Sequence, residues 1–144
     1  MSSWNESYAQ KELARRAAIH SFIDASNSFR KILVPSIQQE LTEFRKHFPN
    51  DFVDLKVTAE GAVQVVHGTG GSTLASVELK WDPIRKVFVF DFPLFPQCSQ
   101  AIPAVVQDGT LTLDFSHTGT TMQTLVQYIL MPVLFPGLIG DPSV

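Results

Sequence analysis

Apolar side chains recur at helical spacing through the first third of the chain. Each position in this series lies three, four or seven residues from another, as in a helix with one buried stripe. The series consists of Ile19, Phe22, Ile23, Phe29, Leu33, Ile37, Leu41, Phe44 and Phe48. Pro35 lacks a backbone N–H and disfavours helical geometry at Val34, so we expect a kink or break there and helices near 4–33 and 36–47. A helix of about 30 residues is about 45 Å long, more than a domain of this size needs to cover its sheet, so part of it is expected to reach a neighbour.

Alternating apolar and polar residues follow after residue 51, and this period of two is typical of strands with one buried face. The alternation predicts strands near 55–59, 62–66, 74–81, 86–92, 104–107 and 111–115. Turn signals separate them, and the pair Asp108 and Gly109 is a strong hairpin signal. We therefore expect an antiparallel meander of five or six strands.

The strand near 86–92 is the most apolar of the series. Its residues Phe88, Phe90 and Phe92 share one face, and Val87 and Val89 make the other face apolar too. Apolar residues on both faces are typical of a strand in the middle of a covered sheet. We expect this strand to be central and covered on both sides.

A last helix is predicted over residues 120–135. Thr120 is placed to cap it, Gln123 completes a capping box, and the helix is expected to continue until Pro132. Its apolar stripe consists of Met122, Leu125, Val126, Ile129 and Leu130. The 144 residues contain no repeat or linker, so we expect one α+β domain over 1–144. A kinked helical segment at 4–47 packs on a β-meander at 52–115, followed by this apolar helix.

Charge and cysteine content argue against several classes of protein. The net charge is −3, and the basic residues alternate with acidic ones, so no nucleic-acid binding is expected. The most apolar stretch, 125–139, is shorter than the about 20 residues of a spanning helix and contains two prolines, so no transmembrane segment is expected. The start of the chain lacks the pattern of a leader, and the single Cys98 has no partner for an internal disulfide. Both features favour a cytoplasmic location.

The C-terminal third of the chain is depleted in charge. Between residues 92 and 140 only Asp108 and Asp114 are charged, whereas globular chains average about a quarter charged residues. Low charge with retained aromatic and methionine side chains is typical of an interface core. The candidate interface residues are Phe92, Phe95, Tyr128, Met131 and Phe135. Two alternatives are open: a last helix buried between the first helix and the sheet, and a membrane-surface helix, which normally carries Lys or Arg on its polar face.

Two short motifs carry candidate chemistry. Residues 67–72, His-Gly-Thr-Gly-Gly-Ser, resemble a phosphate-binding loop, but they lead into a strand and lack the lysine, so we interpret them as a hairpin loop. Ser116 and His117 suggest a nucleophile with its base beside Asp114, yet neighbours on a strand point to opposite faces. His117 is kept as a catalytic candidate. The four histidines are scattered without ligand spacing, so we expect neither a metal site nor a cofactor.

Asp91 is the acid to inspect first, because it lies between Phe90 and Phe92 in the most apolar strand. Burial there would favour a protonated carboxyl that can act as an acid or base. A salt bridge to Lys80 or Lys86, or a place in water at the strand end, is the alternative. Cys98 lies in a proline-rich loop without a recognisable motif and is interpreted as an inert thiol.

These features favour a non-catalytic interaction or assembly protein, such as a small adaptor, a chaperone-like protein or a regulatory subunit. The charge-poor C-terminal surface would hold a second copy of the chain or another protein. The alternative is a binding module or small enzyme for an apolar small molecule, with a pocket between the long helix and the sheet. The side chains expected to line that pocket are Phe22, Trp81, Phe88 and Phe90.

Overall fold

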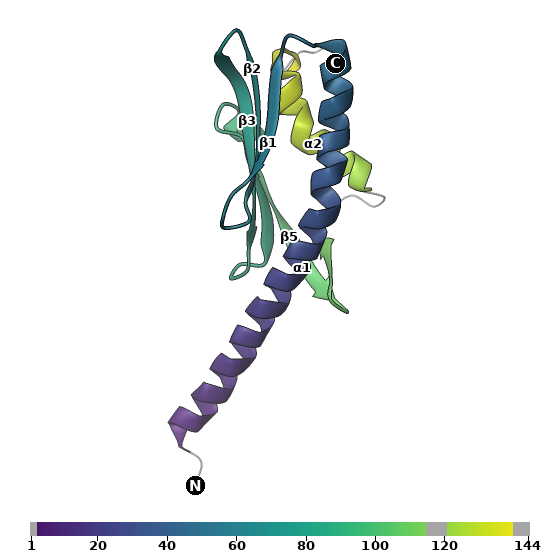
Figure 1. Cartoon of the computed structure of the whole chain (residues 1–144). Helices are drawn as coiled ribbons and strands as arrows, with labels where there is room; N and C mark the ends of the chain where they lie inside the picture. Colours follow the sequence, from purple (N-terminus) through teal and green to yellow (C-terminus); the bar gives the residue numbers. More distant parts are fainter. Residues whose placement is uncertain (1–2, 115–120, 140–144) are drawn as a thin grey trace.

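A computed structural model describes residues 3–114 and 121–139, and in it two helices cover one face of a six-stranded antiparallel sheet (Figure 1). The helices are α1 (Trp4–His47) and α2 (Met122–Leu134). The strands are β1 (Phe52–Val57), β2 (Val63–Thr69), β3 (Ser72–Asp82), β4 (Val87–Asp91), β5 (Gln100–Gln107) and β6 (Thr110–Leu113). Two short 3₁₀ helices, η1 (Pro96–Cys98) and η2 (Pro136–Leu138), complete the elements. The predicted α+β class is confirmed.

Helix α1 is a single element of 44 residues that runs through Pro35. The predicted break into two helices is therefore wrong. Leu33 and Ile37, on either side of the proline, are completely buried on the same stripe, and burying such a side chain stabilises the fold by about 1.5–3 kcal/mol. A proline inside a helix costs about 3 kcal/mol, so packing on both sides outweighs it.

The six strands follow one another in a meander, in the order β1-β2-β3-β4-β5-β6, with every neighbouring pair antiparallel. The predicted meander is confirmed. Asp108 and Gly109 turn β5 into β6 with positive φ angles of 54° and 76°, which suit a two-residue hairpin turn. Gly70 and Gly71, also with positive φ angles, turn β2 into β3, so the glycine-rich run 67–72 is the tip of a hairpin and opens no helix.

The core lies between the two helices and the sheet face that they cover. Phe88 and Phe90 of β4 and Phe92 just after it point into this core with at most 1% of their surface exposed. Strand β4 is central, between β3 and β5. Its other face is only half-buried at Val87 and Val89, so the expected cover on both sides is wrong. Both helices of the described chain pack on the same side of the sheet (Figure 1).

The N-terminal part of α1 projects beyond the sheet (Figure 1). All 44 residues together make a rod about 66 Å long. The first buried residue is Phe22, and from Trp4 to Arg16 every side chain except the half-buried Glu12 is exposed. We call residues 4–18 the projecting segment. Its length agrees with the expectation that this helix extends further than its own sheet.

Candidate functional site

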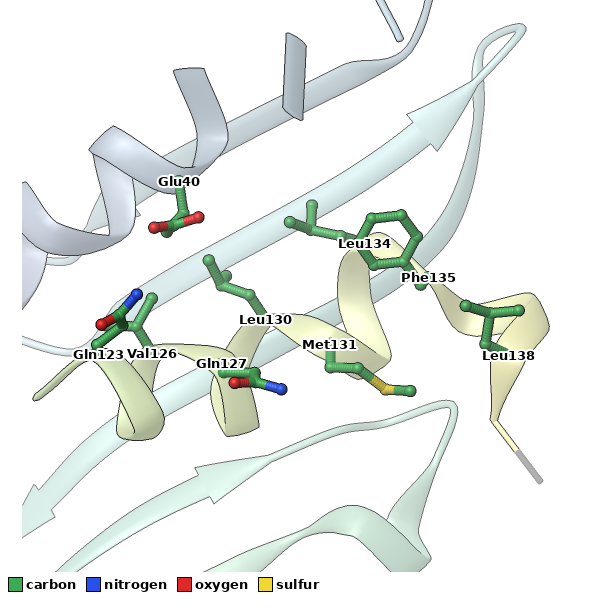
Figure 2. A pocket seen from close by; sticks show the side chains of 9 residues that line it. All are labelled: Glu40, Gln123, Val126, Gln127, Leu130, Met131, Leu134, Phe135 and Leu138. Atoms are coloured by element: carbon green, nitrogen blue, oxygen red, sulfur yellow. The ribbon is translucent and has the colours of Figure 1, made fainter. Parts of the chain in front are cut away.

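A mainly apolar groove between α1 and α2 is the candidate site. Its volume is about 430 Å³, and Figure 2 shows the side chains around it. Glu40 points from α1 toward α2, and Val126, Leu130 and Leu134 point back toward α1. The full lining consists of Glu40, Gln123, Val126, Gln127, Leu130, Met131, Leu134, Phe135 and Leu138. We call this hollow the α1/α2 groove.

Helix α2 places this lining by burying its opposite stripe. Thr121 caps the helix, because its Oγ1 accepts a hydrogen bond of 3.2 Å from the Thr124 N–H. The predicted capping residue Thr120 lies outside the described residues. Leu125, Ile129 and Val133 are at most 2% exposed and anchor the helix on the core. The helix ends at Leu134, within the predicted range 120–135, but it does not stop at Pro132 as expected, because that proline is itself buried in the packed stripe.

The outer side of α2 forms a ridge along the groove. Side chains four residues apart share one side of a helix, and here they are Gln123, Gln127, Met131 and Phe135. The ridge thus changes from amide to apolar along its length. No residue of α2 is charged, which leaves Glu40 as the single charged group in the groove lining.

Phe135 continues the groove into an exposed aromatic cluster. Its ring packs edge-on against Phe44 at 5.6 Å and Phe48 at 6.4 Å, and those two rings stack at 4.8 Å. Phe48 and Phe135 are 43% and 40% exposed, so the cluster joins the groove to an apolar surface. Large apolar side chains that gather at the surface mark contact sites more often than isolated ones do.

The structure separates the five predicted interface residues. Met131 and Phe135 lie together in the groove lining. Tyr128 is 51% exposed but lies outside that lining. Phe92 is 1% exposed and belongs to the core, while Phe95 is half-buried against it. In the chain as described, Phe92 is not available on the surface.

The four side chains predicted for an apolar pocket are also separated. Phe88 and Phe90 pack ring against ring at 5.9 Å inside the core. Phe22 and Trp81 border a second groove, of about 460 Å³, whose lining includes Arg30 and Lys80 but neither Phe88 nor Phe90. Trp81 Nε1 is buried without a hydrogen-bond partner among the described residues, and its ring packs edge-on against Phe29 at 6.4 Å.

The catalytic candidates do not form a site. Asp91 is exposed at the end of β4, where its Oδ1 accepts a hydrogen bond of 2.9 Å from Ser99 Oγ. The same Oγ accepts the Phe92 N–H at 2.9 Å, so this contact shapes the turn after β4. His117 lies outside the described residues. Cys98 is half-buried against the core, and no group of three or more metal-ligating side chains forms within the described part of the chain.

One buried polar contact at the last turn of α2 could not be predicted from the sequence. His67 is 3% exposed, and its two ring nitrogens lie 2.8 Å from Val133 O and 2.8 Å from Asp51 Oδ2. The burial of His67 could have been predicted, because His67 continues the buried alternation of Val63 and Val65 along β2. Its two partners could not be predicted, because Asp51 and Val133 are distant from His67 in the sequence.

None of the helices in residues 3–114 and 121–139 is long and apolar enough to cross a membrane. No protein-family model, curated protein or solved structure matches the chain.

Proposed function

We propose that the protein is a non-catalytic interaction or assembly protein and that the α1/α2 groove is its contact surface. The observation that carries the proposal is the uncharged ridge of α2, which ends in the partly exposed Met131 and Phe135. Interfaces are depleted of charge at their centre and enriched in methionine and aromatic residues.

The chemistry of the groove suits a helix or an extended peptide. An apolar floor binds apolar side chains, and the amides of Gln123 and Gln127 both donate and accept hydrogen bonds at one end. Helix-in-groove recognition places side chains from positions i, i+4 and i+7 in such a channel. Met131 adapts to partners of different shape, because its thioether side chain is unbranched and flexible.

The proposal is tested by adding charge to the ridge. Met131→Glu is expected to dissociate whatever assembly the wild-type chain forms, because an unpaired carboxylate in an apolar contact is costly to desolvate. Ile84→Glu is the matched control, since Ile84 is 74% exposed on the β3–β4 turn and receives the same charge. Solution mass by light scattering and the thermal midpoint are measured for both. An assembly that survives Met131→Glu in a folded protein contradicts the proposal.

A further inference from the structure

We propose that the occupant of the α1/α2 groove is the projecting segment of a second copy of this chain. Trp4 and Tyr8 would pack on the apolar part of the ridge, and Lys11 would lie beside Glu40. This inference rests on the proposed function, because it names the partner of that contact surface.

The projecting segment carries an exposed aromatic pair. Trp4 is 76% exposed and Tyr8 63% exposed, with ring centres 6.2 Å apart in an edge-on arrangement. Lys11 Nζ lies 5.4 Å from the centre of the Tyr8 ring. Positions 4, 8 and 11 share one side of a helix, which is the i, i+4, i+7 pattern of a helix that binds in a groove. The free end of α1 therefore presents two apolar anchors and one cation on a single face.

The groove is complementary to that face. Met131 and Phe135 offer apolar surface to the two rings beside the buried Leu130 and Leu134, and a methionine sulfur contacts aromatic rings favourably. Glu40 is the single charge in the lining and forms no ion pair within the described residues. Lys11 likewise forms none there. A cation at the third anchor position thus meets the one anion of the groove.

The projecting segment continues a packed helix but buries no side chain of its own. Most helical stability in proteins comes from packing an apolar face. Within the projecting segment the described side-chain contacts are local ones, chiefly the pairs of Glu12 with Arg15 and Arg16. Such exposed pairs contribute little. A partner that covers Trp4 and Tyr8 supplies the missing packing.

The occupant must come from another copy. Lys11 and Glu40 lie 29 residues apart on one continuous helix, about 44 Å, so a chain cannot fill its own groove. The midpoint between Lys11 and Glu40 on the helix lies between Ala25 and Ser26, about 22 Å from each of them. Two antiparallel copies aligned at that midpoint bring Lys11 of each chain level with Glu40 of the other, and Trp4 and Tyr8 level with the last turns of the other α1. Two-fold pairing uses both grooves and leaves no end unfilled.

The test is the dimer dissociation constant of the full-length chain, measured by sedimentation. The double variant Trp4→Ala, Tyr8→Ala is expected to raise the dimer dissociation constant tenfold or more. Losing one aromatic anchor from an interface typically has an effect of this size. Leu13→Ala is the matched control. Leu13 is a 64% exposed apolar residue of the same segment, but it lies on the opposite side of the helix from Trp4 and is expected to leave the constant unchanged.

Charge reversal identifies the pairing of Lys11 with Glu40. Lys11→Glu and Glu40→Lys are each expected to weaken the dimer, and the two together to restore most of it. Helix content is measured for each variant, so that a folding defect is recognised. Equal effects of the single variants without recovery in the double variant overturn the proposed register.

The outcomes separate this inference from the proposed function. A wild-type chain that stays monomeric at high micromolar concentration overturns the inference. So does a dimer that Met131→Glu dissociates but Trp4→Ala, Tyr8→Ala does not, although the groove then remains a contact surface with another occupant. A dimer that both changes weaken, and that Leu13→Ala spares, supports both statements.

Discussion

His67 and Asp51 meet between the sheet and the loop after α1, with Nε2 of the imidazole 2.8 Å from Oδ2 of the carboxylate. The other ring nitrogen, Nδ1, lies 2.8 Å from the carbonyl oxygen of Val133. A carbonyl oxygen only accepts hydrogen bonds, so Nδ1 carries a proton. One buried side chain of β2 thereby links the loop after α1 to the last turn of α2, whose Met131 and Leu134 line the groove.

This link predicts that Asp51→Ala lowers the free energy of unfolding by about 1–3 kcal/mol. Removing the carboxylate leaves a buried ring nitrogen without its hydrogen-bond partner, and a buried group left without a partner usually costs about 1–3 kcal/mol. Urea titration measures the change. Asp54→Ala, at a half-buried carboxylate on β1, is the control and is expected to change stability by less than about 0.5 kcal/mol. Equal effects at the two positions would show that the contact with His67 adds nothing.

Pro35→Ala is expected to raise the free energy of unfolding by about 1–2 kcal/mol. The substitution restores a backbone N–H in the middle of α1, where proline costs about 3 kcal/mol, and part of the gain is lost to the greater freedom of the unfolded chain. Pro35 is exposed, so no packing is removed. Urea titration again provides the measurement, with Gln39→Ala as the control for an exposed position of the same helix. A loss of stability would mean that the helix depends on this proline for its shape.

Gly61→Ala is expected to cost more stability than Gly70→Ala. Both glycines have positive φ angles, 85° and 57°, so an added Cβ strains each backbone. Only at Gly61 would the new Cβ also collide with the Arg30 guanidinium, whose Nη1 donates a hydrogen bond of 3.0 Å to the Gly61 carbonyl. Around Gly70 there is open space. The difference between the thermal midpoints of the two variants measures how much the contact between Arg30 and the β1–β2 turn stabilises the fold. Equal midpoints would show that this contact contributes nothing.

The projecting segment has a testable titration. Hydrogen bonds from Arg15 and Arg16 lower the pKa of Glu12 from 4.5 to about 2. A lowered carboxyl pKa means that its contribution to helix stability is present above pH 4.5 and is lost as the pH falls toward 2. The titration of the Glu12 carboxyl carbon by NMR is expected to have its midpoint near 2 in the wild type and closer to 4.5 in the double variant Arg15→Ala, Arg16→Ala. An unshifted midpoint in the wild type would show that these exposed pairs do not persist in water.

The sheet could be predicted from the sequence because the patterns that specify strands and turns involve residues close together in the chain. Alternation along each strand and turn residues such as Asp108 and Gly109 depend only on near neighbours in the chain. The break predicted at Pro35 failed for the opposite reason. Local geometry at a proline was outweighed by Leu33 and Ile37, whose burial depends on the sheet and on α2.

The candidate site was readable only in part. Charge depletion pointed to the C-terminal third, and Met131 and Phe135 do line the groove. The same composition also selected Phe92, because a core strand and an interface are both apolar and aromatic. Glu40 was missed, since its place opposite α2 depends on the packing of two helices that are distant in sequence.

The most direct test of the contact surface is native mass spectrometry of the untagged full-length chain, purified gently from its own host. The account predicts a mass that is a multiple of the 16.0 kDa chain, or the chain with another protein. It also predicts that Met131→Glu returns the mass to that of one chain while Ile84→Glu leaves the assembly intact. A wild-type protein found only as a bare 16.0 kDa monomer would contradict the account and leave the uncharged ridge of α2 as ordinary surface.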